Sequence, residues 1–418
     1  MAVVDAFGKK VGKLSEEDGS KARSLMLLGY KAQECRLKHV PDKRLPKSKQ
    51  YLSWLIMHYM RQVLLHPEHS AMTSLFVPAE PLLASGFLPY SVEGFSAFMT
   101  GTRCQDALLD KESMDPCLCS YHRIFLGGVE SGLLPLPPFL IYTNVACDAN
   151  MITFPFLSNE HAIPRFFLEV PYEVSDESVH FVADRLKEMT SFIEDNAHVK
   201  VDEGKLRETV ERSRKTISLF GEYLPLAGNH YVPGDITSQM YEIMTNHMLL
   251  GSEESLKYWD MTVKDYQEAP SSKGLKILWL HTIPFSQKPV RDLLNFNPRV
   301  RVVASEMPAE GMLPSSESDP YLFMANRLVH SAFNSSVDQR IARALEVASK
   351  VRPDGVVFYC HWGCKGTLAS APMVKEAMEK AGYPTLTLDG DGCDMKAQSD
   401  GQTETRLEAF VEMLEARK

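Results

Sequence analysis

Three of the eight cysteines in this sequence stand where a regular element is predicted to meet a loop. Cys147 and Cys364 each follow a short β-prone run, and Cys119 comes just before a predicted helix. Free N–H groups and the dipole at a helix N-terminus favour a thiolate. If two α/β domains face each other, these thiols could converge on one cleft and hold a metal or cluster with an open fourth position. An open position is what a Lewis-acid or substrate-binding iron needs.

The alternative is that these three cysteines only pack in the protein core, because free cysteines are among the most buried residue types. Without an export signal, eight cysteines indicate reduced thiols or metal ligands more than a disulfide framework. The gaps between Cys117 and Cys119 and between Cys360 and Cys364 do not give the paired C-x-x-C motifs typical of zinc sites. The remaining cysteines are Cys35, Cys104 and Cys393.

The stretch around Cys364 predicts one β-α-β unit. Residues 356–359 form a short apolar run that suits a buried strand, and the thiols follow it directly. Pro372 is predicted to open a helix that runs to about Lys380, and residues 384–388 form the next strand. In open α/β sheets, ligands bind in the crevice beyond the carboxyl ends of the strands.

The fold class that follows is α/β, with two Rossmann- or flavodoxin-like parallel-sheet domains facing a cleft and a helical insert between them. In the first domain, strands are predicted at 74–77, 88–90 and 139–145. In the second, long crossovers between four candidate strands at 275–280, 300–304, 355–359 and 384–388 predict parallel pairing. The expected units are an N-terminal arm or helical extension at 1–48, a first α/β domain at 49–172, a helical region at 173–268 and a second α/β domain at 269–418.

Composition excludes several classes of protein. The 418 residues are 44% hydrophobic and 24% charged, as in an ordinary globular protein. A formal net charge of −9 without a basic face argues against nucleic-acid binding. The sequence shows no G-x-G-x-x-G after the first strand and no P-loop motif, so nucleotide binding has no support. No signal peptide or membrane-spanning run is recognised, and a cytoplasmic location is expected.

Segments in both predicted domains are similar to those of the 2-hydroxyacyl-CoA dehydratases, iron–sulfur enzymes related to the benzoyl-CoA reductases. Residues 78–89 resemble a family segment of the form P-x-E-x-x-x-A-x-G-x-x-P. Cys119 before its helix and Cys147 within Asn-Val-Ala-Cys-Asp resemble the first two cluster cysteines. Residues 360–367 and 388–410 resemble the C-terminal signature, and the Cys-His-Trp-Gly-Cys segment favours an α-type subunit. Four such segments in the family's order cover the chain from about residue 50 onwards.

The resemblance implies a 4Fe-4S cluster held by Cys119, Cys147 and Cys364, with one iron lacking a protein thiolate. Cys364 is preferred to Cys360 because its distance to Pro372 matches the family spacing. By family position, Ser74 and Glu93 are candidate catalytic residues that contact the substrate. His122 and His361 are further polar groups near the presumed cleft, and His361 is alternatively a packing residue behind the cluster.

The family mechanism addresses a β-hydrogen that is scarcely acidic in a 2-hydroxyacyl-CoA. The open iron binds the thioester carbonyl oxygen and passes one electron to it, and the resulting ketyl radical anion expels the α-hydroxyl. The enoxy radical that remains has a far more acidic β-hydrogen. A base removes this hydrogen, the electron returns to the cluster, and the (E)-2-enoyl-CoA leaves.

The implied partners are a related β-type subunit with its own cluster and a separate ATP-dependent iron–sulfur activator. A benzoyl-CoA-reductase-like subunit, which consumes electrons, and a non-catalytic electron-relay or scaffold subunit are the alternatives. Asp389 and Asp391 could bind a metal or a ribose hydroxyl, or instead shape the turn before the last helix. With no Arg or Lys assignable to a second substrate carboxylate, the sequence favours an uncharged acyl chain.

Overall fold

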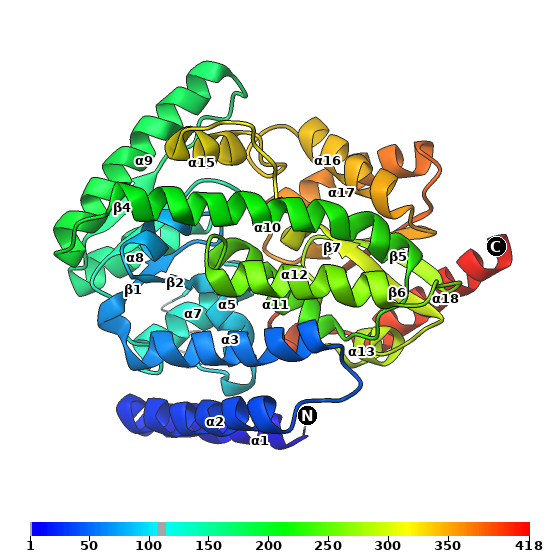
Figure 1. Cartoon of the computed structure of the whole chain (residues 1–418). Coiled ribbons are helices and arrows are strands. Elements are labelled where there is room, and N and C mark those ends of the chain that lie inside the picture. Colours follow the sequence, from blue (N-terminus) through cyan, green and yellow to red (C-terminus); the bar gives the residue numbers. More distant parts are fainter. Residues whose placement is uncertain (1, 107–113) are drawn as a thin grey trace.

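Two four-stranded parallel sheets with the same strand order organise the molecule (Figure 1). The structure is a computed structural model, and it describes residues 2–106 and 114–418. The sheets run β2-β1-β3-β4 and β6-β5-β7-β8, so both have the local order 2-1-3-4 of flavodoxin-like folds. The predicted fold class is confirmed. The strands are β1 (Ser70–Thr73), β2 (Leu88–Ser91), β3 (Leu140–Thr143), β4 (Arg165–Leu168), β5 (Leu275–Leu280), β6 (Val300–Ser305), β7 (Gly355–His361) and β8 (Thr385–Gly390).

Helices connect and cover these strands. In the first half they are α3 (Lys47–Leu65), α4 (Glu80–Ala84), α5 (Val92–Met99), α7 (Ser120–Glu130) and α8 (Asn150–His161), with the 3-10 turns η1 (Pro67–His69) and η2 (Thr100–Thr102). In the second half they are α13 (Lys288–Leu294), α14 (Glu306–Glu310), α15 (Pro320–Val329), α16 (Val337–Val351), α17 (Lys365–Lys380), η3 (Met395–Ala397) and α18 (Asp400–Arg417).

A group of long helices joins the two halves. They are α9 (Asp176–Ala197), α10 (Glu203–Asn229), α11 (Ile236–Met248) and α12 (Glu253–Glu268). The apolar stripe of α10 from Leu206 to Leu224 is buried, as its 3.6-residue period predicts. Figure 1 shows α10 crossing the molecule, and it packs against α4 of the first half and against β6 and α16 of the second. Glu80 on α4 accepts hydrogen bonds from Ser213 on α10 and from Arg327 on α15, at 2.9 and 2.7 Å.

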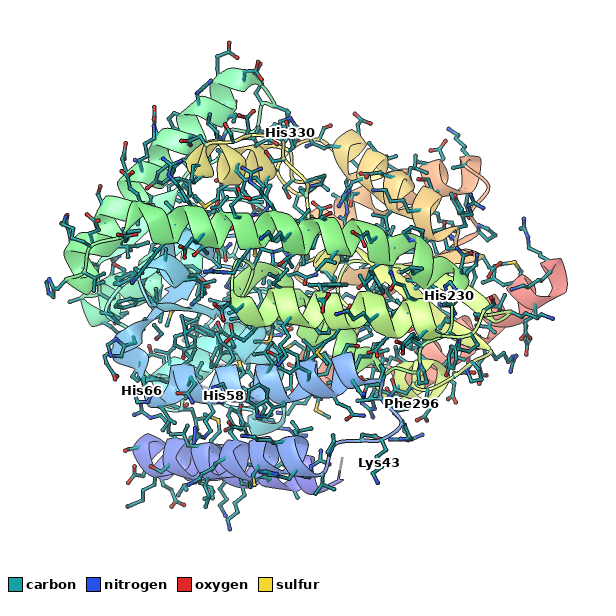
Figure 2. All side chains as sticks on the ribbon, viewed as in Figure 1. Lys43, His58, His66, His230, Phe296 and His330 are labelled. Carbon is teal, nitrogen blue, oxygen red and sulfur yellow. The ribbon has the colours of Figure 1, made fainter. Side chains whose placement is uncertain are left out.

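The N-terminal segment forms a helical hairpin of α1 (Ala2–Glu17) and α2 (Gly19–His39). In Figure 1 it lies below α3, and α1 also contacts η2. Figure 2 shows His58 on the side of α3 that faces the hairpin, where its Nδ1 lies 2.7 Å from Glu34 Oε1 on α2. No helix in the described residues is both long and apolar enough to cross a membrane.

Two element predictions are wrong. Residues 74–77 are not a strand, because β1 ends at Thr73 and Val77 N–H donates to the Ser74 carbonyl across a tight turn. Pro372 does not open a helix, since α17 begins at Lys365 and Pro372 lies inside it. The carbonyl that Pro372 leaves without a helical partner is that of Leu368, which is exposed and can be hydrated.

Candidate functional site

A cavity of about 1050 Å³ lies where the carboxyl ends of the two sheets face each other. Segments that follow the first and third strands of each sheet line it, together with α5, α7, α8 and α11. This is the strand-order reversal at which doubly wound sheets bind ligands. The wall includes Cys119, Cys147, Cys364 and Glu93.

Each of the three thiols is placed at the start of a helix. Cys119 is the N-cap residue of α7 and Cys364 is that of α17. Cys147 follows β3 and precedes α8, and its carbonyl accepts the Asn150 N–H at 3.3 Å. Two thiols therefore come from the first half and one from the second. Helix N-termini direct N–H groups and a positive partial charge toward sulfur, which favours metal-ligating thiolates.

The loops that carry the thiols have unusual backbone conformations. Ala146, beside Cys147, has a φ of 71° and Gly363, beside Cys364, has a φ of 82°. A side chain on Gly363 would place its Cβ 2.9 Å from the Cys119 Cα, so the two thiol loops touch there. Left-handed alanine is strained, and such strain concentrates at functional sites.

A histidine ring nitrogen lies beside each sulfur. His361 Nε2 is 3.2 Å from Cys119 Sγ, and His122 Nε2 is 3.4 Å from Cys147 Sγ. His281 Nε2 is 3.9 Å from Cys364 Sγ.

Burial dominates the electrostatics of these groups. It raises the pKa of Cys119 to about 12 and raises that of Cys147, with smaller contributions from the neighbouring thiols. It lowers the pKa of His122 to about 3 and also lowers the pKa of His361, where Asp391 partly opposes it. Burial thus favours the protonated form of the Cys119 and Cys147 thiols and the neutral form of the His122 and His361 rings, and a positively charged metal group would favour the thiolates instead.

The donor set matches an iron–sulfur cluster better than one ion. Among the described residues, no three His, Cys, Asp or Glu side chains are close enough to hold a single metal ion. A 4Fe-4S cluster binds each thiolate to a different iron, so its ligands need not meet at one point. Three thiols that face one cavity from separate elements, with a histidine ring nitrogen near each sulfur, fit such a cluster.

The two candidate catalytic residues are placed differently. Glu93 lines the cavity, half-buried, accepts the Ser91 hydroxyl at 3.1 Å, and has its pKa raised by burial. Ser74 is not among the described residues of the wall. Its hydroxyl oxygen accepts the Thr143 N–H at 3.2 Å, which joins the end of β1 to β3.

The other cysteines differ from these three. Cys360 is buried within β7, and the Cys104 thiol donates to the Ile124 carbonyl at 3.3 Å. Cys393 is also buried, and Cys35 is exposed. Cys117 is exposed and lines the cavity beside Cys119.

The Asp391 loop has a structural role. Asp391 is buried and accepts hydrogen bonds from the Ser120 hydroxyl at 2.6 Å and from the Cys393 and Asp394 N–H groups. Ser120 is the first residue of α7, so this carboxylate ties the second sheet to the helix behind Cys119. Asp389 pairs with Arg406 at 3.0 Å. The turn-shaping interpretation of this segment is confirmed.

His281 and the Glu306–Arg340 pair that holds it were not identified from the sequence alone. His281 directly follows β5, has a φ of 67°, and donates its N–H to Glu306 at 2.7 Å. Glu306 is buried in a two-point pair with Arg340, whose N–H groups donate at 2.8 and 2.7 Å. Arg340 also lies 3.4 Å from the Gly366 carbonyl in the first turn of α17. The available signal was position, because a residue at the carboxyl end of a first strand faces the crevice.

Fold and site together define a class: a two-domain α/β protein with a thiol-lined cavity suited to an iron–sulfur cluster. A family model described as 2-hydroxyglutaryl-CoA dehydratase, D-component, matches residues 74–414. The chain belongs to this family, as the sequence segments predicted.

Curated relatives agree with this membership. The chain is 22% identical over 349 residues to the lactoyl-CoA dehydratase subunit alpha of Anaerotignum propionicum, covering 73% of this chain and 81% of the relative. It is 22% identical over 334 residues to the (R)-2-hydroxyisocaproyl-CoA dehydratase alpha subunit of Clostridioides difficile, covering 72% and 78%. It is 21% identical over 308 residues to the (R)-2-hydroxyglutaryl-CoA dehydratase subunit alpha of Acidaminococcus fermentans, covering 68% of this chain and 61% of the relative. All three are named alpha subunits.

Proposed function

We propose that this chain is the α-type subunit of an (R)-2-hydroxyacyl-CoA dehydratase, a hydro-lyase that converts its substrate to the (E)-2-enoyl-CoA. The observation that carries the proposal is the convergence of Cys119, Cys147 and Cys364 on one cavity between the two sheets. These residues would hold a 4Fe-4S cluster with one iron lacking a thiolate. When bound, the cluster would supply an open coordination site for the thioester carbonyl oxygen and a single electron for ketyl-radical chemistry.

Among the titratable side chains that line the cavity, Glu93 is the proposed acid–base group. Burial raises the pKa of Glu93, and its place on α5 puts the carboxyl group in the cavity wall, where a proton-transfer group would be needed. In the proposal, Glu93 moves a proton at its carboxyl oxygens, either to the departing hydroxyl or from the β-carbon. Ser74 is proposed from family position as a substrate-side residue. The neighbouring Leu75 and Phe76 line the wall, and Ser74 fixes the strand end from which they project.

The cavity wall favours an uncharged acyl chain. The described part of the wall contains no arginine. The side chain of Lys365 is 87% exposed, and its Nζ lies 3.8 Å from an Asp148 carboxylate oxygen. Much of the remaining wall is apolar or sulfur-containing: Leu75, Phe76, Ala97, Ile152, Phe156, Met240, Ile243, Met244 and Met307. Methionines adapt to varied apolar shapes, so branched or aromatic chains are accommodated.

The proposal includes partners. A related β-type subunit with its own cluster would complete the heterodimer, and an ATP-dependent iron–sulfur activator would supply the first electron. Reduced thiols and this electron supply suit a cytoplasmic location.

The test is anaerobic purification with the co-expressed partner, iron and sulfide analysis, and EPR of the reduced protein. Cys119→Ala, Cys147→Ala and Cys364→Ala should each abolish this subunit's 4Fe-4S signal. Cys360→Ala, in the adjacent strand, should retain the signal and is the matched control. A 2-hydroxyisocaproyl-CoA should shift the wild-type spectrum more strongly than 2-hydroxyglutaryl-CoA. A well-folded subunit free of iron would overturn the proposal, and net electron consumption per turnover would indicate a reductase instead.

A further inference from the structure

Three histidines and three cavity thiols are paired one to one. Their separations are 3.2 Å for His361 and Cys119, 3.4 Å for His122 and Cys147, and 3.9 Å for His281 and Cys364. In every pair the nearer ring atom is Nε2. The rings come from the last residue of β7, the first turn of α7 and the residue after β5, so the repetition is not a product of one local motif.

The contact of the other ring nitrogen fixes the tautomer of His361 and is compatible with the same tautomer in His122 and His281. His361 Nδ1 accepts the Gly392 N–H at 3.0 Å, so a neutral ring must carry its hydrogen on Nε2. His122 Nδ1 lies 2.8 Å from the Thr153 hydroxyl, and His281 Nδ1 lies 3.2 Å from the Thr282 hydroxyl. With these hydroxyls donating to Nδ1, all three rings direct an N–H toward sulfur.

The backbone at His281 has an uncommon conformation, which directs its ring toward Cys364. A φ of 67° is rare for a non-glycine residue, and the buried Glu306 fixes it by accepting the His281 N–H. Arg340 in turn anchors Glu306 and approaches the first turn of α17, which carries Cys364. One buried pair therefore positions both the ring and the sulfur that it faces.

We infer that His361, His122 and His281 are positioning residues that each donate one N–H···S hydrogen bond to a cluster thiolate. The inference rests on the proposed function. Hydrogen bonds to cluster sulfurs stabilise the more negative, reduced cluster, so the set raises its reduction potential. A raised potential serves an enzyme that returns its electron to the cluster after every turnover, because the reduced form must persist between substrates.

The experiment is a potentiometric EPR titration of the anaerobically purified complex. His122→Phe, His281→Phe and His361→Phe keep a ring but remove the donor, whereas the corresponding Gln variants retain an N–H. We expect each Phe variant to keep its iron and sulfide while its reduced-to-oxidised ratio at a fixed potential falls about tenfold, which is 59 mV for one electron. The Gln variants should recover part of this loss.

His247→Phe is the matched control. His247 is also buried, and its Nε2 lies 2.9 Å from the Met307 carbonyl instead of a thiol. Its replacement should leave the midpoint potential at the wild-type value. Midpoints in the three Phe variants that equal that of His247→Phe would overturn the inference while leaving the cluster, and so the proposed function, intact. A wild-type subunit without a 4Fe-4S cluster would overturn both.

A second measurement starts from the wild-type protein and tests the inference even if the Phe variants lose iron. Wild-type protein grown with ¹⁵N-histidine should show weak ¹⁵N hyperfine couplings in pulsed EPR of the reduced cluster, transmitted through the N–H···S bonds. His122→Gln should remove one set of couplings. Wild-type spectra without any histidine coupling would overturn the inference.

Discussion

The two sheets share one strand order but support their thiols differently. Cys147 follows β3 and Cys364 follows β7, the third strands of their sheets. After the first strands, however, Ser74 bonds back into the sheet, whereas His281 reaches the cavity and faces a sulfur. Equivalent topology thus places equivalent thiols, while the side chains around them have diverged.

The two halves also use different interactions to hold the histidines beside their thiols. In the first half, neutral hydrogen bonds hold the ring beside Cys147, through His122 and Thr153. In the second half, a buried ion pair between Glu306 and Arg340 holds the residue beside Cys364. Breaking a buried ion pair leaves an uncompensated charge and costs more than losing a neutral hydrogen bond. The second half should therefore be the more sensitive to a single substitution.

Arg340→Met should have the largest effect. It leaves Glu306 charged and unpaired at 4% exposure, which should lower the free energy of unfolding by about 3–5 kcal/mol. Denaturant unfolding measures the loss. Arg299→Met, which breaks an exposed pair with Glu415, should cost far less than Arg340→Met. Equal losses in the two variants would show that the buried pair gives the second half no special support.

Gly363→Ala should come next, because it strains the backbone and pushes against Cys119. Gly382→Ala is the matched control, with a φ of 91° and no atom within 4 Å of a new Cβ. The control should lose about 1 kcal/mol from strain, and Gly363→Ala about twice that. Urea unfolding gives both values. Iron content should fall with Gly363→Ala, and an equal fall in the control would contradict contact between the thiol loops.

Thr153→Val tests how much the neutral hydrogen bond beside Cys147 stabilises the first half. Removing the hydroxyl beside His122 Nδ1 should cost about 1 kcal/mol in the free energy of unfolding. Thr405→Val, on the exposed surface of α18, should be nearly neutral by the same thermal or denaturant measurement. A loss as large as that of Arg340→Met would remove the contrast between the two halves.

Glu93→Gln should have the smallest effect on the stability of the protein, and this effect should depend on pH. Because burial raises the pKa of Glu93 in the folded state, the folded protein binds this proton more tightly than the unfolded chain. Wild-type stability should therefore rise relative to the variant as the pH falls through the raised pKa. Thermal unfolding at pH 8 and pH 5.5 measures this, and a gap that moves in the opposite direction would contradict the shift.

The sequence predicts those elements whose signal is local. The four strands of the second sheet are confirmed within one or two residues, because each is a continuous apolar run with clear boundaries. Strand β4 was missed, since its four residues start with the exposed Arg165. Residues 74–77 were misassigned because their apolar side chains are buried in a turn and not in a strand.

The site residues also fall into those with a local sequence signal and those that depend on contacts between distant residues. Cys119, Cys147, Cys364 and Glu93 could be proposed from element boundaries and family segments, and the structure brings them to one cavity. The position of His281 after β5 indicates that it faces the crevice, but its orientation toward Cys364 could not be predicted. Its orientation depends on a left-handed backbone held by Glu306, a contact between residues that are distant in the sequence and that no periodicity reveals.

The division of the thiols between the halves also bears on biosynthesis. Cys119 and Cys147 leave the ribosome well before Cys364, and α10 cannot pack against α16 until α16 has been made. A nascent chain therefore carries two of the three cavity thiols before the third has been made. In the proposed function, loading of the cluster would await translation of β7 and α17, which carry the third thiol.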